Sequence, residues 1–179
     1  MKTLSLSITI ALLAVGCAAN RTGAAGSDLG TPRQYQGPPP SELITLEIAV
    51  PDGWKRQQLG DYVRAGEIDN RISNDELKAI ILVAIVPTKQ TSPAESAAVL
   101  ALQLMLQGAE TSKIAVAEDG SQATFTWSVA AQGLGGKVSF RIFPDKKQLM
   151  ALFMGTWLAA SDDKARPAFD AMAASATIK

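Results

Sequence analysis

The chain has 179 residues, of which 17 are basic and 17 are acidic, and it contains no histidine. This charge balance argues against a nucleic-acid-binding protein, because such proteins normally present a basic face. Without histidine the chain lacks the commonest general base near neutral pH and the commonest transition-metal ligand, which excludes imidazole triads and histidine zinc sites.

Residues 1–16 have the pattern of a signal peptide. Lys2 supplies a positive charge, and the segment from Leu4 to Val15 contains no charged side chain. A run of about a dozen residues is shorter than the roughly 20 helical residues that cross a bilayer. A removable signal peptide is therefore favoured over a transmembrane helix.

Cys17 is the only cysteine, and it follows the small and apolar stretch Leu13-Ala14-Val15-Gly16. This stretch resembles the lipobox of bacterial lipoproteins, although Ala14 stands where leucine is usual. The resemblance implies that a diacylglyceryl group is attached to the sulfur of Cys17 and that a signal peptidase cleaves between Gly16 and Cys17. It also implies acylation of the new amino terminus. The alternative is an ordinary signal peptide with a chance cysteine.

Ala18, rather than an aspartate, follows the cysteine. For a lipoprotein of a Gram-negative bacterium, this residue implies sorting to the outer membrane, with the domain facing the periplasm. A lipidated Cys17 would leave no thiol for a disulfide, for thiolate catalysis or for a metal ion. We therefore expect a cell-envelope protein whose membrane contact is a lipid anchor.

Residues 17–41 are rich in Gly, Pro, Ala and polar side chains, and Leu29 and Tyr35 are their only large apolar groups. Such a segment cannot bury enough apolar surface to offset its ordering entropy, so we predict a flexible tether. Residues 42–179 are long enough to form one hydrophobic core, and a single globular domain is expected there.

The domain has the pattern of strands, a helix, a meander of strands and a closing helix. Runs of apolar residues predict strands at 43–50, 62–68, 79–86, 124–130, 137–143 and 149–158. The run at 79–86 is apolar throughout, which is typical of a central strand covered on both faces. Asp162 and Asp163 favour the start of the closing helix, in which Phe169 and Met172 would face the sheet.

Ser92, Pro93 and Glu95 have the spacing of a capping box with proline at the first helical position. The helix is predicted to end at Gly108. Its apolar stripe, which we expect to lie against the sheet, comprises Val99, Leu100, Leu102, Met105 and Leu106.

These elements predict an α+β fold with a largely antiparallel central sheet of about six strands and helices on both faces. Several stretches match a known pattern: VPDGW at 50–54, the helix SPAESAAVLALQLM, the glycines of 133–136 and the closing GTWL and FDAMAASATIK. On these stretches, residues 43–178 resemble the PsbP-like fold, shared by the extrinsic photosystem II subunit family and a nuclear Ran-binding family. The resemblance implies a binding, assembly or accessory protein, and it transfers no individual binding residue.

The segment from Gly133 to Lys137 has the glycine content of a phosphate-binding loop. A Walker loop requires glycine where Ala131 stands, and it opens a helix rather than a strand. A hairpin loop is therefore predicted.

Oxygen-bearing side chains cluster between two predicted strands, at Asp69, Asn70, Asn74, Asp75 and Glu76. They could bind calcium, but they lack the central glycine and terminal glutamate spacing of an EF-hand loop. A turn rich in Asp and Asn is the simpler interpretation.

Met150 and Met154 lie four residues apart on a predicted strand, hence about 13 Å, too far to share one copper ion. Core packing is predicted for these residues and for Met105 and Met172. The tryptophans Trp54, Trp127 and Trp157 are likewise predicted to be core or rim aromatics.

No nucleophile elbow and no supported pair of carboxylates is visible, so the sequence predicts no catalytic residue, metal or cofactor. The favoured function is a lipid-anchored, non-catalytic domain that binds a protein partner or assists assembly. A small apolar ligand held between helix and sheet is the alternative. An enzyme would require carboxylates such as Asp61, Glu67 and Asp69 to meet in one cleft.

Overall fold

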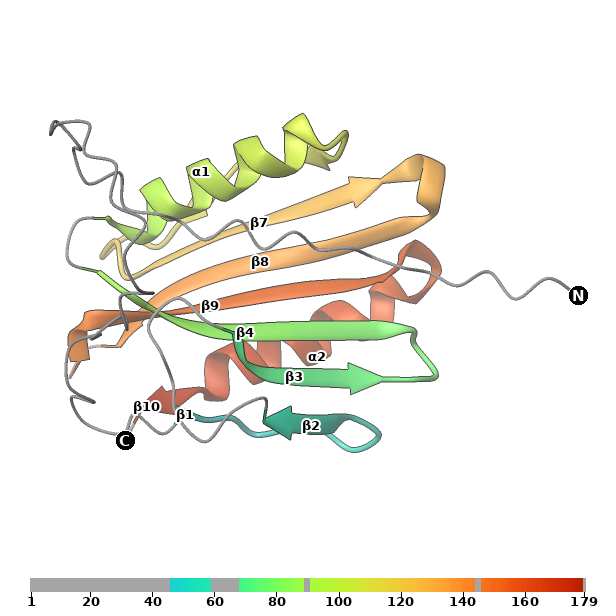
Figure 1. Ribbon diagram of the computed structural model, residues 1–179, viewed down its shortest axis with the longest axis horizontal. Coiled ribbons are helices and arrows are strands. Elements are labelled where there is room, and N and C mark those ends of the chain that lie inside the picture. Colours follow the sequence, from blue (N-terminus) through green and yellow to red (C-terminus); the bar gives the residue numbers. More distant parts are fainter. Residues whose placement is uncertain (1–45, 59–67, 89–90, 144–145, 179) are drawn as a thin grey trace, which may run out of the picture. The chain divides into compact units, whose positions relative to one another are not determined.

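An antiparallel sheet of eight strands forms the centre of the computed structural model (Figure 1). The structure describes residues 46–58, 68–88, 91–143 and 146–178, all within one compact unit, Pro40–Lys179. In spatial order the strands are β2 (Lys55–Gln58), β3 (Ile68–Asn74), β4 (Ala79–Pro87), β9 (Lys146–Leu158), β8 (Leu134–Phe143), β7 (Gln122–Val129) and β5 (Glu110–Thr111), and β6 (Ala115–Val116) also pairs with β7. The α+β class is thus confirmed, and the predicted count of about six strands was too low.

The additional strands are short or polar, which is why hydrophobic patterning did not indicate them. The sequence KRQQ of β2 contains no apolar residue, and β5 and β6 have two residues each. The predicted strand at 62–68 falls almost entirely outside the described residues; β3 begins only at Ile68.

The first predicted strand, 43–50, was too long at its C-terminal end. Among the described residues it is reduced to β1 (Leu46–Glu47), which pairs with β10 (Thr177–Ile178) in a separate two-stranded sheet. The carbonyl oxygen of Leu46 accepts a hydrogen bond from the guanidinium of Arg56 at 2.7 Å. This side-chain bond joins β1 to the strand β2 of the main sheet.

Two helices pack against alternate residues of β8, one against even-numbered and the other against odd-numbered positions. Helix α1 (Pro93–Leu106) shares a core with Val138 and Phe140. Helix α2 (Asp162–Ser175) is bonded to odd-numbered residues of the same strand, since Lys137 pairs with Asp170 and Arg141 donates to the carbonyl of Ala173. Successive side chains of a strand point to opposite faces, so each helix contacts a different face of β8. Short 3₁₀ turns at Ala130–Gln132 and Ala159–Ser161 follow β7 and β9.

The larger core lies between α2 and strands β3, β4 and β9. Its fully buried members include Ile81, Val83, Phe153, Trp157 and Phe169. Phe169 projects from α2 and makes an edge-to-face contact with Phe153, their ring centroids 6.4 Å apart. The predicted inward positions Phe169 and Met172 are both confirmed as fully buried.

The second core lies under α1, and it uses a different side of that helix than predicted. Ala97, Ala101 and Leu104 pack on the aromatic residues Phe125 and Phe140. Of the predicted stripe, only Leu100 packs against this core, whereas Val99, Leu102, Met105 and Leu106 are exposed. The small alanines allow the helix axis to approach the bulky side chains of the sheet. Size complementarity, rather than the number of large apolar residues, therefore decides which side of α1 is buried.

The capping box of α1 is confirmed, and it supplies a testable contribution to stability. The Ser92 hydroxyl accepts from the amide of Glu95 at 3.2 Å, and the Glu95 carboxylate accepts from the amide of Ser92 at 2.8 Å. Replacing Ser92 with alanine is expected to cost about 1 kcal/mol of unfolding free energy, because one amide of the first turn loses its acceptor. Chemical denaturation of the variant measures this loss, and an unchanged midpoint would contradict it.

The same contacts hold the pKa of Glu95 below its ordinary value, through the backbone amide of Ser92 first and its hydroxyl second. A carboxylate whose pKa is lowered by folding stabilises the folded state at pH values above its unfolded-state pKa of about 4.3. The contribution is lost as the pH falls through the folded-state pKa. In the Ser92→Ala variant, NMR titration is expected to show the pKa of Glu95 rising toward its ordinary value.

Candidate functional site

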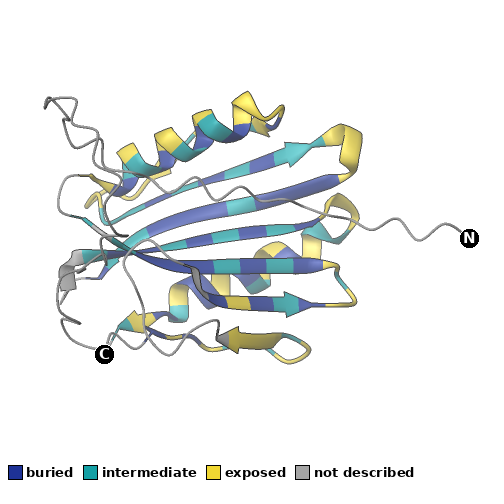
Figure 2. Ribbon diagram, in the orientation of Figure 1, coloured by how far each residue is buried: buried dark blue, intermediate teal, exposed yellow. Residues whose placement is uncertain are grey.

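The side of α1 that faces away from the sheet carries a stripe of apolar side chains. We call it the outer stripe, formed by Ala98, Val99, Leu102, Met105 and Leu106. The exposed fractions of its four large members are 49% for Val99, 56% for Leu102, 54% for Met105 and 80% for Leu106. Figure 2 shows this side of α1 as exposed along its length. Met105 was predicted to fill the core, and that prediction was wrong.

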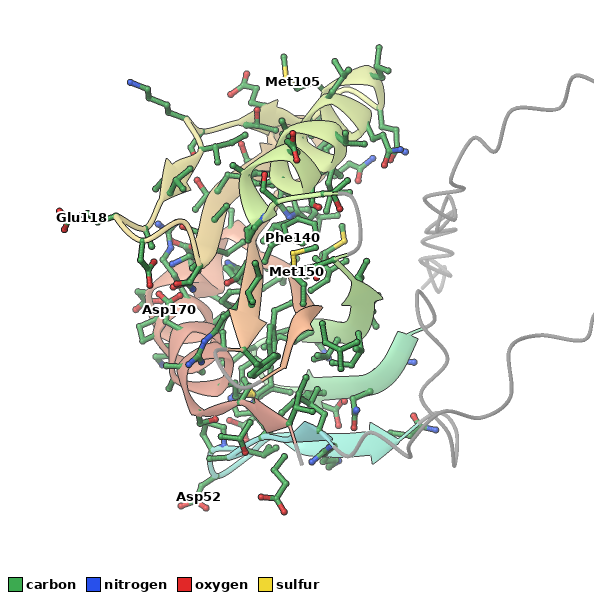
Figure 3. All side chains as sticks on the ribbon, turned by 90° about the vertical axis from the view of Figure 1, so that its left-hand side faces the viewer. Asp52, Met105, Glu118, Phe140, Met150 and Asp170 are labelled. Carbon is green, nitrogen blue, oxygen red and sulfur yellow. The ribbon has the colours of Figure 1, made fainter. Side chains whose placement is uncertain are left out.

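Helix α1 is therefore apolar on two opposite sides. Ala97, Ala101 and Leu104 are buried against the sheet, and the outer stripe lies across the helix from them. In Figure 3, Met105 lies on the far side of α1 from Phe140 and Met150, which lie between the helix and the sheet. Glu95 is the sole charged residue of Pro93–Leu106. A helix of this kind is normally buried on both sides.

A second apolar surface lies on the same side of the sheet as α1. We call it the half-face; it consists of Ile80, Leu82 and Val86 of β4 and of Leu152 and Met154 of β9, all partly exposed. Leu82 pairs with Met154 in the register, and Met154 packs at the margin of the core under α1. The principal contacts of α1 are with β5, β7 and β8, and Val86 and Leu152 also pack at the margin of the core beneath the helix.

The continuous apolar run at 79–86 therefore has two different environments. Ile81, Val83 and Ile85 are fully buried in the core beneath α2. The alternate residues Ile80 and Leu82 keep part of their surface exposed and belong to neither core among the described residues. The prediction of a strand buried on both faces is correct for one face and only partly correct for the other.

Two hollows of the described surface are lined by polar and apolar atoms in similar proportion. One, of about 410 Å³, lies between the start of α2 and strands β5 and β7, where Glu110, Asp162 and Arg166 line it. Asp162 is already engaged, because it accepts hydrogen bonds from the Trp157 indole at 2.9 Å and from Arg166 at 2.6 Å. The other lies beside Arg56 and Ser175. Neither has the apolar lining that would suit a small hydrophobic ligand.

The oxygen-bearing side chains at 69–76 lie in strand β3 and in the turn that follows it. Asn70 is fully buried in β3 and accepts from the Arg56 Nε at 2.6 Å. Asn74 accepts from the amide of Leu77 and donates to the carbonyl of Gly53, which joins two turns. Asp75 is exposed, and its ion pair with Lys55 lowers its pKa. The amide oxygens that could have bound calcium are therefore used within the protein.

Among the described residues no three Asp, Glu, His or Cys side chains are grouped as metal ligands. Asp61 and Glu67, two of the three carboxylates that an enzyme would require in one cleft, lie outside the described residues. The same applies to Gly16 and Cys17. No helix in the described ranges is long and apolar enough to cross a membrane.

The glycine segment 133–137 joins β7 to β8, but only its first residue lies outside the strands. Gly133 ends the 3₁₀ turn with a φ of 62°, a conformation that favours glycine. Gly135 and Gly136 belong to β8, so the predicted hairpin loop is shorter than expected. The indole of Trp127 lies against the backbone of Gly136, which identifies packing as the role of that glycine.

The remaining methionines and tryptophans are structural, in agreement with their predicted roles. Met150 is fully buried in the core under α1, and Met154 packs at its margin. Trp157 is fully buried, Trp127 is 8% exposed, and Trp54 packs at the edge of the core beneath α2.

The antiparallel sheet, the helix α1 inserted before the three long strands β7, β8 and β9, and the closing helix α2 define a PsbP-like domain, and solved structures share this fold. The chain is similar to the solution structure of cyanobacterial PsbP (CyanoP) from Synechocystis sp. PCC 6803, with a TM-score of 0.50 and 15% identity over 84% of this chain and 99% of that one. It is equally similar to LpqN, involved in cell envelope biogenesis of Mycobacterium tuberculosis, with a TM-score of 0.50 and 18% identity over 80% of this chain and 87% of that one. No protein-family model and no curated protein sequence matches the chain.

Proposed function

We propose that this protein is a lipid-anchored, non-catalytic component of the cell envelope, whose domain acts by binding a protein partner. The anchor is Cys17, and the domain faces the periplasm from the outer membrane. The observation that carries the binding role is the outer stripe of α1, because four large apolar side chains are about half exposed or more on one helix. Exposed contiguous apolar surface of this kind marks interaction sites on soluble domains.

Two further observations support the envelope location. The stretch Leu13–Gly16 before Cys17 has the small and apolar character of a lipobox. One of the proteins with the same fold, LpqN, is described as involved in cell envelope biogenesis. The likeness itself concerns the fold, and the lipobox pattern supplies the reason to propose the same compartment.

The anchor also explains how a modest binding surface can be sufficient. One acyl chain holds a protein only marginally on a membrane, whereas two or more chains hold it stably. Restricting the domain to the membrane surface raises its effective concentration toward partners held there. A stripe of a few side chains can then function without high intrinsic affinity.

Metabolic labelling tests the anchor. Cells that express the full chain are expected to incorporate an alkyne analogue of palmitate into the wild-type protein and not into the Cys17→Ser variant, because serine cannot accept the diacylglyceryl group as a thioether. The matched control Ala18→Ser changes the next residue and is expected to keep the label. Equal labelling of wild type and Cys17→Ser would show that the lipid is not on this cysteine.

A further inference from the structure

The four methionines of the described residues differ in their contact with solvent. Met150 and Met172 are fully buried, and Met154 is partly buried at the margin of the core under α1. Met105 is 54% exposed and belongs to neither core. In Figure 3 it lies on the outer side of α1, whereas Met150 lies beneath the helix. Met105 therefore carries the most accessible thioether of the described part of the chain.

The neighbours of Met105 on α1 do not enclose its sulfur. Helical side chains lean toward the preceding turn, so Met105 lies over Ala101 and Leu102. The side chain of Ala101 is a single methyl group that points to the core, and Leu102 is itself 56% exposed. A small solute in water can therefore reach the thioether without any opening of the fold.

We propose that Met105 is a site of reversible oxidation, at which a peroxide converts the thioether to a sulfoxide in the folded protein. An electron pair of the sulfur attacks one peroxide oxygen, so that an S–O bond forms and the O–O bond breaks. The hydroxide that leaves takes the hydroxyl proton from the transferred oxygen and becomes water. The sulfur is thereby oxidised and the peroxide is reduced. Methionine sulfoxide reductases reverse this modification.

Oxidation at this position changes the outer stripe and leaves the two cores intact. The sulfoxide is polar, and it lies beside Leu102 within an otherwise apolar surface. Its oxygen requires a hydrogen-bond donor, which an apolar contact does not supply. Oxidation is therefore expected to weaken binding through the outer stripe. This consequence rests on the proposed function, whereas the oxidation itself depends only on the exposure of Met105.

Peptide mass mapping after treatment with hydrogen peroxide tests the site in the detergent-extracted full chain. Met105 is expected to oxidise at least about tenfold faster than Met150 and Met172, because buried sulfurs react only when the fold opens. Met154 is expected to react at an intermediate rate. In concentrated urea the four rates are expected to converge. Equal rates for Met105 and Met150 in the folded chain would overturn the proposal.

A relocated methionine provides the matched control. Val116 is 49% exposed on β6, outside the outer stripe. In a chain that carries both Met105→Leu and Val116→Met, the new methionine is expected to oxidise within a few-fold of the rate of Met105 in the wild type. A new methionine as slow as Met150 would mean that exposure does not set the rate.

The effect on binding is tested in cells that express the full chain with a photo-cross-linking residue in place of Leu106, which is 80% exposed. Peroxide is expected to reduce the cross-linked product several-fold when Met105 is present. In the chain with Met105→Leu and Val116→Met, the product is expected to match that of its own untreated sample. An equal decrease in both chains would overturn the effect of Met105 on binding.

The two readouts separate failure of the oxidation site from failure of the binding role. Absence of any cross-linked product from untreated cells would overturn the proposed binding through the outer stripe, and the peptide map would still decide whether Met105 is the site of oxidation. Selective oxidation of Met105 with an undiminished cross-link would overturn its effect on binding and leave the proposed function standing.

Discussion

Replacing Gly136 with alanine is expected to destabilise the domain by about 3 kcal/mol, the upper part of the range for overpacked cores. An added Cβ would overlap the carbonyl oxygen of Gly155 in the neighbouring strand and would lie 2.6 Å from the Trp127 Nε1. The carbonyl belongs to the backbone of a central strand, and the indole is 8% exposed. Neither group can move without disturbing the core under α1.

The adjacent Gly135 provides a matched control. A Cβ at that position would meet only the carbonyl oxygen of Trp127, at an ordinary distance of 3.5 Å. Gly135→Ala is therefore expected to change stability by less than about 1 kcal/mol, since alanine also reduces the entropy of the unfolded chain. Urea denaturation of both variants measures the difference. Similar losses in the two would contradict the packing role assigned to Gly136.

Replacing Phe169 with alanine is expected to cost about 3–5 kcal/mol, the range for removing a buried aromatic side chain. Phe169 is fully buried, and it contacts the rings of Phe153 and Trp157, with centroid separations of 6.4 and 6.0 Å. Gly155 provides the space for this ring, because a Cβ there would approach Phe169 to 2.8 Å. Loss of the ring would leave a cavity between α2 and β9.

Phe169→Leu retains most of the buried volume and is expected to lose clearly less stability than the alanine variant. Thermal unfolding and urea denaturation of the two variants measure the difference. Near-equal stability of wild type and Phe169→Ala would mean that α2 does not depend on this contact with the sheet.

Much of the fold could be predicted because it follows from local chemistry. The capping box of Ser92 and Glu95 marks the start of α1. Continuous apolar runs mark β4 and β9, and alternating apolar residues mark β7 and β8. Hydrophobic patterning did not predict strand β3, because the strand buries a polar residue, Asn70, whose side chain accepts a hydrogen bond from Arg56 of β2. That contact links residues far apart in the sequence, and no local pattern indicates it.

The sequence predicted part of the candidate site, the outer stripe of α1. The stripe of Val99, Leu102 and Leu106 was visible in the sequence, but it was expected to face the sheet. A helix that is apolar on both sides offers two possible buried faces, and hydrophobicity alone does not choose between them. Ala97 and Ala101 decide the outcome because their small size allows close approach to Phe125 and Phe140. Which aromatic side chains lie opposite these alanines depends on the tertiary structure, and the sequence of α1 does not reveal it.

The lipid anchor is the central claim, and the mass of the mature protein tests it most directly. The protein is extracted gently from membranes, and its intact mass and N-terminal peptide are measured by mass spectrometry. We predict a chain that begins at Cys17 and carries the added mass of a diacylglyceryl group and an amide-linked acyl chain. A mature protein with an unmodified Cys17, or one that begins at another residue, would contradict the account.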